Sequence, residues 1–311
     1  MIIVCNNMNS LSHKHLISIE DLNIEDVRII LDRARDLKSS KDIPQTLLGK
    51  NILSLFFEDS TRTRISFEIA TNKLGGQLVR WDVKSSSANK GETFQDTTQT
   101  LNAMRPDAVI VRHNDYGAPH YVSTVMDCPV VNAGDSWNQH PTQALLDAFT
   151  LEEHFNSLDG LRIAICGDIA HSRVAQSNMM LLHKMGAKVV IIAPPFLRPE
   201  KFPIPDVDVY NSMEEGLKDC DAIMMLRNQK ERMTAGLIHS DEEFFDNYGL
   251  NKTRLGIANK NAVVLHPGPM NRNVEIADDV ADDAKHSLIL KQVENGVFVR
   301  MAILDLLING K

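Results

Sequence analysis

The regular alternation of short apolar runs with longer helical stretches constrains this fold more than any other feature of the chain. In the first half, β-rich runs occupy residues 51–57, 78–81, 108–111 and 130–132. The alternation restarts beyond residue 153, with runs at 162–166, 188–193, 222–226 and 262–265. Strands that alternate with helices in this way pair in parallel and are covered by helices on both faces. We therefore predict an α/β fold with two domains, each a parallel sheet flanked by helices.

Start and stop signals place the main helices. Asn23 is a suitable N-cap, with an aspartate three residues later and an apolar helical stripe beyond it. A second helix is expected from near Ser60 to the glycine pair 75–76, where a left-handed cap is possible. Residues 141–153 form a long predicted helix with proline in its first turn, and the tail 297–308 has helical apolar spacing. We expect the long helix to join the domains and the C-terminal helix to return.

The length of the chain also favours two domains. Its 311 residues exceed what one hydrophobic core usually organises, so two domains of about 150 residues are expected. We predict a first domain over residues 1–147 and a second over 148–286. The terminal helix, at about 287–311, is expected to pack back on the first domain.

The composition excludes several classes of protein. No apolar run approaches the ~20 residues that a membrane helix needs, and the N-terminus lacks the basic and apolar regions of a secretory signal. A cytoplasmic protein is therefore expected. The four cysteines lie far apart without a C-x-x-C pair, which favours reduced, buried thiols over disulfides or a zinc site.

The net charge of −8 argues against non-specific nucleic-acid binding, which depends on an excess of lysine and arginine. An anionic ligand must then meet positive charge that is concentrated locally. This directs attention to individual arginines rather than to the total charge.

The first segment with chemical character lies where the strand ending at Phe57 meets the next helix. Residues 58–64 read E-D-S-T-R-T-R, so hydroxyl and guanidinium groups gather at a helix start. First-turn N–H groups and the positive end of the helix dipole bind anions, and Arg62 adds a bidentate donor that stays charged. An isolated S-T-R would fit a capped helix with solvated arginines equally well.

The string S-T-R-T-R at 60–64 resembles the carbamoyl-phosphate motif of the aspartate/ornithine carbamoyltransferase family. The H-P-T-Q at 140–143, in the context of residues 132–147, is similar to the aspartate-specific branch, whereas the ornithine-specific branch typically has H-P-C-Q there. Taken alone, a histidine beside a proline is more often a helix cap or a buried hydrogen-bonding residue. Six separated motifs occur in family order, and the resemblance runs from about Leu16 to the terminal helix.

The resemblance implies a carbamoyl-phosphate site. Arg62 and Arg112 would hold the phosphate, while His140, Thr63 and Arg112 would polarise the carbonyl as negative charge develops on its oxygen. Gln143 would hold the amide nitrogen. The residues implied for this substrate are Ser60, Thr61, Arg62, Thr63, Arg112, His140, Gln143, Pro267, Gly268 and Pro269. Those implied to be catalytic are Arg62, Thr63, Lys90, Arg112 and His140.

The polar segment 85–93, S-S-S-A-N-K-G-E-T, has the small residues expected of a loop that closes over substrates, although a plain surface loop has the same composition. Its K-G-E-T resembles the family loop that enters the active site of the neighbouring subunit in a trimer. Ser86 and Lys90 match that loop by register. The resemblance therefore implies a homotrimer with shared active sites.

Aspartate carries two carboxylates, which a water-excluding cleft accepts only with paired cations. Arg173, at a predicted strand end, and Arg227, in a string that resembles the family R-x-Q-x-E-R, are the matching arginines. Gln229 would help to orient the aspartate, and Lys90 would also contact it.

The H-P-G-P at 266–269 resembles the family loop whose backbone carbonyls hold the carbamoyl nitrogen and the incoming amine. Gly268 and Met270 stand where some bacterial members have leucine and arginine. Families with ornithine as acceptor show H-C-L-P there instead, which favours aspartate.

The implied activity is transfer of the carbamoyl group of carbamoyl phosphate to L-aspartate, giving N-carbamoyl-L-aspartate and phosphate, in de novo pyrimidine biosynthesis. No metal or organic cofactor is expected, because carbamoyl phosphate is already an activated acyl donor. The expected partners are the two substrates and two further copies of the chain, without nucleic acid or membrane. The sequence does not determine whether a regulatory or dihydroorotase chain associates.

Three alternatives stay open on the sequence. The acceptor could be ornithine or a modified ornithine, although two arginines suit a dicarboxylate better. A nicotinamide-dependent dehydrogenase would share the βα alternation, but no G-x-G-x-x-G follows the strand ending at Cys166. A non-catalytic binding relative of the family would be expected to lack some of the site residues, and all are present.

Overall fold

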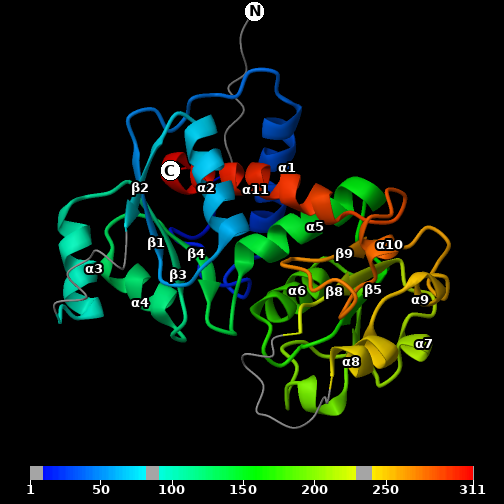
Figure 1. The fold of residues 1–311 in the computed structure, drawn as a ribbon. Coiled ribbons are helices and arrows are strands. Elements are labelled where there is room, and N and C mark those ends of the chain that lie inside the picture. Colours follow the sequence, from blue (N-terminus) through cyan, green and yellow to red (C-terminus); the bar gives the residue numbers. More distant parts are fainter. Residues whose placement is uncertain (1–9, 82–90, 229–239, 311) are drawn as a thin grey trace, which may run out of the picture. The chain divides into compact units, whose positions relative to one another are not determined.

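The computed structural model describes residues 10–81, 91–228 and 240–310. The chain divides into two compact units: unit 1 comprises Met1–Leu145 and Gly296–Lys311, and unit 2 comprises Leu146–Asn295. The divisions fall within two long helices, α5 (Pro141–Phe155) and α11 (Ile289–Asn309). The predicted α/β class is confirmed, because each unit is built on a parallel sheet with helices against it (Figure 1).

Unit 1 contains a four-stranded parallel sheet in the order β2-β1-β3-β4. Its strands are β1 (Asn51–Phe56), β2 (Gln77–Trp81), β3 (Ala108–His113) and β4 (Val130–Asp135). Strands β3 and β4 are buried over most of their length, because helices cover both faces of a parallel sheet. The four strands match the predicted runs to within three residues at each end.

Four described helices lie wholly within unit 1: α1 (Ile24–Ser39), α2 (Thr61–Lys73), α3 (Phe94–Ala103) and α4 (Ala118–Val125). Helix α1 begins as predicted, because Asn23 and Asp26 form a reciprocal capping box. Leu101 of α3 and Val122 of α4 pack against Leu53, Leu55 and the alternate residues of β3. Helix α2 packs against β1 and β2, and Figure 1 shows it on the side of the sheet away from α3 and α4.

The C-terminal part of α11 belongs to unit 1 and is held there by polar contacts. Asp305 forms an ion pair of 2.6 Å with Arg33 of α1, and its carboxylate is fully buried. The guanidinium of Arg300 lies 5.1 Å from the ring centroid of Phe67 in α2, within range of a cation–π contact. The amide of Asn309 donates to the carbonyl of Thr46 at 3.1 Å.

Unit 2 contains a five-stranded parallel sheet in the order β7-β6-β5-β8-β9. Its strands are β5 (Arg162–Cys166), β6 (Lys188–Ile192), β7 (Asp208–Tyr210), β8 (Ala222–Met225) and β9 (Val263–Leu265). Helix α6 (Arg173–Lys184) follows β5, and the shorter helices are α7 (Met213–Gly216), α8 (Asp241–Tyr248), α9 (Lys252–Leu255) and α10 (Asp278–Ala281), with a 3₁₀ turn at Pro195–Leu197. Strand β7 was absent from the sequence-based prediction.

Three of the cysteines, Cys128, Cys166 and Cys220, are buried free thiols, as the sequence predicted. Burial raises the pKa of both Cys128 and Cys220 to about 11, and raises the pKa of Cys166 well above its usual value. These thiols are therefore protonated at neutral pH. Within the described part of the chain, no helix combines the length and the apolar character that crossing a membrane requires.

Candidate active site

The chain order reverses at one place in each sheet. In unit 1, β1 leads to β2 on one side, and β3 and β4 follow on the other, so the reversal lies between β1 and β3. In unit 2 it lies between β5 and β8. In open α/β sheets, ligands bind outside the carboxyl ends of the strands at such a switch point. Of the residues predicted from sequence, Ser60–Thr63 follow β1, Arg112 lies near the end of β3, Arg173 and Arg227 follow β5 and β8, and His140 and Gln143 follow β4.

At the first switch point, the chain leaves β1 and enters α2 at Ser60, the N-cap residue. The Ser60 hydroxyl forms no capping bond to the first turn, so it does not compete with an anion for those N–H groups. Thr61 and Arg62 are exposed in the first turn, whereas Thr63 is buried. The helix start therefore offers a hydroxyl, a guanidinium and the positive end of the helix dipole together.

Arg112 lies near the end of β3, directly across the switch point from the end of β1. Its Nε donates to Glu58 Oε2 at 3.0 Å, and its Nη2 lies 2.9 Å from the same oxygen. Its Nη1 donates to the carbonyl of Ala133 at 3.4 Å. Both charged side chains are largely buried, with 12% and 13% of their surface exposed. Glu58 is part of the sequence motif at residues 58–64, but no role was predicted for it from the sequence.

His140 immediately precedes α5 and is 3% exposed. Its Nε2 lies 3.5 Å from the hydroxyl oxygen of Thr63, at the outer limit of a hydrogen bond. Gln143, in the first turn of α5, is also buried, and its N–H donates to the His140 carbonyl at 3.0 Å. The structure thus brings together Thr63 and His140, two of the groups that the sequence assigned to the substrate carbonyl.

At the second switch point, β5 ends at Cys166 and is followed by Gly167, whose φ is +115°. A Cβ at this position would lie 2.9 Å from the Leu226 carbonyl oxygen, so only glycine lets the ends of β5 and β8 approach this closely. Two arginines, one in each segment that follows these strands, are the predicted partners of the aspartate carboxylates. Arg173 is the first residue of α6 and is buried, and Arg227, directly after Leu226, is half-buried.

The turn between Gly167 and α6 is closed by hydrogen bonds. Asp168 is fully buried, and its Oδ1 accepts from the His171 N–H at 3.2 Å and contacts His171 Nδ1 at 2.8 Å. Ser172 caps α6 by accepting from the N–H of Ala175 at 3.2 Å. The position of Arg173 is therefore set by a cap and by the Asp168–His171 contact rather than by helix propensity alone.

The third segment, Pro267 to Pro269, follows β9. Pro267 and Gly268 are half-buried and Pro269 is exposed. The preceding His266 is buried, with Nδ1 2.8 Å from the Gly268 nitrogen and Nε2 3.1 Å from Glu275 Oε1. His266 and Glu275 occur in the sequence strings, but their contact across eight intervening residues gave no sequence signal.

Three predicted site residues, Ser86, Lys90 and Gln229, lie outside the described residues.

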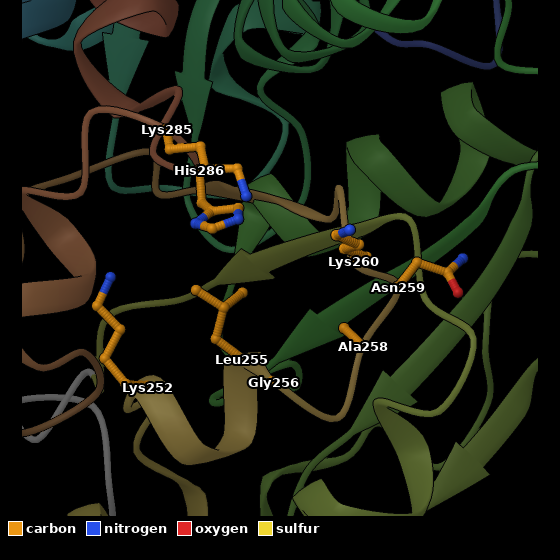
Figure 2. Close-up of a pocket in the computed structure, with 8 residues that line it drawn as sticks. All are labelled: Lys252, Leu255, Gly256, Ala258, Asn259, Lys260, Lys285 and His286. Carbon is orange, nitrogen blue, oxygen red and sulfur yellow. The ribbon is translucent and has the colours of Figure 1, made fainter.

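A cavity of about 350 Å³ in unit 2 is lined by none of the predicted site residues (Figure 2). Two of the side chains that line it already have partners, because Lys252 is paired with Asp283 and His286 Nδ1 lies 2.8 Å from the same carboxylate. The cavity is lined by Lys252, Leu255, Gly256, Ala258, Asn259, Lys260, Lys285 and His286. Over residues 10–81, 91–228 and 240–310, no three His, Cys, Asp or Glu side chains gather as metal ligands.

Curated relatives and solved structures resemble the chain over nearly its full length. It is 50% identical over 298 residues to the aspartate carbamoyltransferase catalytic subunit of Gluconacetobacter diazotrophicus, covering 94% of this chain and 92% of that protein. It is 50% identical over 308 residues to the subunit of the same name from Rhodospirillum centenum, covering 98% and 97%. The aspartate transcarbamoylase of Trypanosoma cruzi, solved with carbamoyl phosphate and aspartate, is 31% identical with a TM-score of 0.87, covering 96% and 98%.

The same enzyme solved with carbamoyl aspartate and phosphate also gives 31% identity and a TM-score of 0.87, covering 95% of this chain and 96% of that one. Two family models match the chain in succession. The carbamoyl-P binding domain of aspartate/ornithine carbamoyltransferase matches residues 14–153, and the Asp/Orn binding domain matches residues 159–307. The resemblance read from the sequence motifs is thus confirmed, and the chain belongs to the aspartate/ornithine carbamoyltransferase family.

Proposed function

We propose that this chain is an aspartate carbamoyltransferase, which transfers the carbamoyl group of carbamoyl phosphate to L-aspartate in de novo pyrimidine biosynthesis. One observation carries the proposal: anion-binding groups lie at the β1/β3 switch point, and two arginines lie at the β5/β8 switch point. The relatives named for this activity and the related structures with carbamoyl phosphate, aspartate and carbamoyl aspartate support it.

Carbamoyl phosphate is the ligand of the first switch point. Its phosphate takes the first-turn N–H groups of α2 with Ser60, Thr61 and Arg62, together with Arg112. Thr63 and His140, in contact at 3.5 Å, face the carbonyl oxygen with Arg112, and Gln143 holds the amide nitrogen. The domain that contains these residues, 1–147 with the returning terminal helix, is the carbamoyl-phosphate-binding domain.

Aspartate is the ligand of the second switch point, in a domain over residues 148–286. Arg173 and Arg227 neutralise its two carboxylates, which is why a dicarboxylate suits this edge better than ornithine does. Gln229 orients the substrate. The carbonyl groups of the Pro267–Pro269 loop accept hydrogen bonds from the carbamoyl nitrogen and the incoming amine.

The reaction requires positioning and charge stabilisation rather than a covalent enzyme intermediate. The aspartate amine attacks the carbonyl carbon, and negative charge develops on the carbonyl oxygen near Thr63, Arg112 and His140. The bond from that carbon to the phosphate oxygen then breaks, and the departing phosphate takes the proton lost by the amine. No metal or cofactor enters this scheme, because the donor is already activated.

The proposed enzyme is a cytoplasmic homotrimer. Ser86 and Lys90, on the loop that resembles the shared loop of the family, reach the active site of the neighbouring subunit. Lys90 there neutralises anionic charge that accumulates as phosphate departs and contacts the aspartate.

An acceptor assay tests the proposal directly. The purified chain is supplied with carbamoyl phosphate and either aspartate or ornithine, and the carbamoylated product is measured. We expect N-carbamoyl-L-aspartate and equimolar phosphate, with no product from ornithine. Formation of citrulline instead would show that the acceptor is ornithine rather than aspartate. Absence of product with both amines would refute the transferase assignment.

A further inference from the structure

His266 makes three directional contacts although it carries no role in the scheme above. Its backbone N–H donates to Gln292 Oε1 at 2.9 Å, its Nδ1 lies 2.8 Å from the Gly268 nitrogen, and its Nε2 lies 3.1 Å from Glu275 Oε1. The side chains of His266 and Glu275 are both fully buried. All these residues belong to unit 2.

The contacts determine where the imidazole carries its proton. The Gly268 backbone nitrogen can only donate, so Nδ1 of His266 must accept and cannot carry a proton. A neutral ring then carries its proton on Nε2, which donates to the Glu275 carboxylate. A doubly protonated ring would set two N–H groups against each other at Gly268, so this arrangement requires the neutral Nε2–H tautomer.

Glu275 ties the two ends of the loop together. The same oxygen that meets His266 also accepts from the Asn271 N–H at 2.5 Å. His266 and Asn271 bracket the four residues from Pro267 to Met270. A single buried carboxylate oxygen therefore closes the loop at its base and selects the histidine tautomer at the same time.

The bond to Gly268 has a consequence for the loop carbonyls. Proline has no N–H, so in Pro267-Gly268-Pro269 the only backbone donor is that of Gly268, and His266 accepts from it. The Pro267–Gly268 peptide bond is trans, and in a planar trans peptide the C=O points opposite to the N–H. Binding the Gly268 N–H to His266 therefore turns the Pro267 carbonyl away from the buried pair. Gly268 has φ +66°, a conformation in which a side chain would be strained.

We propose that His266 is a positioning residue, held in one tautomer by Glu275, that fixes the direction of the Pro267 carbonyl. This inference rests on the proposed function, in which the loop carbonyls accept from the substrate nitrogens. His266 touches no substrate and acts through the orientation of the Pro267–Gly268 peptide. A carbonyl free to rotate would lose the geometry that brings the amine to the carbonyl carbon.

Two substitutions separate the contacts of the ring. In His266→Asn, the amide oxygen can take the place of Nδ1 and accept from Gly268, but the contact with Glu275 is lost. In His266→Gln, the amide nitrogen can take the place of Nε2 and donate to Glu275, but the acceptor for Gly268 is lost. We expect His266→Gln to lower kcat by about 10- to 100-fold, the size of loss that a small misplacement of the reacting groups causes, and His266→Asn to lower it by roughly fivefold or less. Affinity for carbamoyl phosphate should change little in either variant.

Melting temperatures are measured for both variants, so that kcat is compared between folded proteins. Equal losses of kcat in the two variants, or no loss in His266→Gln, would overturn the positioning role. Neutron diffraction from wild-type crystals tests the tautomer without any variant: the proposal requires hydrogen on Nε2 and none on Nδ1. Hydrogen on Nδ1 would refute it even if neither variant folded.

The wild-type acceptor assay keeps the two proposals apart. If wild-type protein forms no carbamoyl aspartate, the proposed function fails, whatever the tautomer is. If it forms the product but the two variants behave alike, only the role of His266 fails.

Discussion

Glu58 and Arg112 form an ion pair that joins the ends of two neighbouring strands at the β1/β3 switch point, with Nη2 2.9 Å from Oε2. Both side chains are nearly buried, so the carboxylate compensates a guanidinium that lies where the substrate phosphate is proposed to bind. The ion pair with Glu58 thereby holds the Arg112 guanidinium at this edge of the sheet before the substrate phosphate binds.

The pair should contribute to stability. Glu58→Ala removes the acceptor of two Arg112 contacts and should lower the free energy of unfolding by about 2 kcal/mol, as expected for hydrogen bonds to charged groups. Glu58→Gln keeps an oxygen acceptor of the same reach and should lose less. Urea denaturation of the three proteins measures both effects. Equal stability of the alanine variant and the wild type would show that water compensates Arg112 just as well.

Acceptor binding should depend on Arg227. Arg227→Ala removes one proposed carboxylate partner and should raise the KM for aspartate by roughly 10- to 100-fold, the equivalent of about 1.4–2.7 kcal/mol. Carbamoyl phosphate binding, measured by calorimetry, should be retained. Loss of carbamoyl phosphate affinity with normal aspartate kinetics would reverse the assignment of the two switch points.

His140 should support turnover without supporting the fold. We expect it to act as a neutral hydrogen-bonding partner of the substrate carbonyl, and His140→Ala should lower kcat by about 10²- to 10³-fold, as at other oxyanion sites. Circular dichroism should be unchanged, because α5 does not need this side chain to form. A folded variant with unchanged turnover at saturating substrates would exclude the catalytic role.

Acid should destabilise the protein partly through His113. Burial lowers the pKa of His113, although Asp115, Glu58 and Asp135 oppose the shift, and Nδ1 accepts from the Asp115 N–H at 2.9 Å. The unfolded chain therefore binds this proton more readily than the native state, so stability is full above about pH 6.5 and falls as pH decreases below it. Replacing His113 with Phe should reduce the slope of unfolding free energy against pH in that window and leave the slope at pH 8 unchanged. An unaltered slope below pH 6.5 would contradict the shift.

The shared site predicts complementation between two inactive variants. If Arg62 acts in its own site and Lys90 acts in that of the neighbour, Arg62→Ala and Lys90→Ala chains refolded together at equal amounts should regain activity. A site is intact only when its own chain keeps Arg62 and the neighbour keeps Lys90, so random mixing restores about one quarter of sites. Mass spectrometry confirms that hybrids form. If activity stayed at the average of the separate variants, both residues would come from one chain.

The sequence by itself determined the local structure and the chemical groups available. Hydrophobic periodicity located the strands and the long helices, because burial on a sheet or helix face imposes a period that the chain must carry. Asn23 and its capping box marked the start of α1, since a cap involves only neighbouring residues. Strand β7 was not predicted, because its three residues, two of them exposed, are too few to show a period.

Only the tertiary structure decided which of these groups meet. Strand order cannot be read from periodicity, so the positions of the two switch points came from the sheets. The family resemblance had already grouped Arg112 with Arg62 and Arg173 with Arg227, and the sheets supply the strand order that places these arginines at the switch points. The contacts of Glu58 with Arg112 and of His266 with Glu275 join residues 54 and 9 positions apart. Such contacts depend on how strands and turns pack in space, and neither residue of a pair carries a mark of its partner in the local sequence.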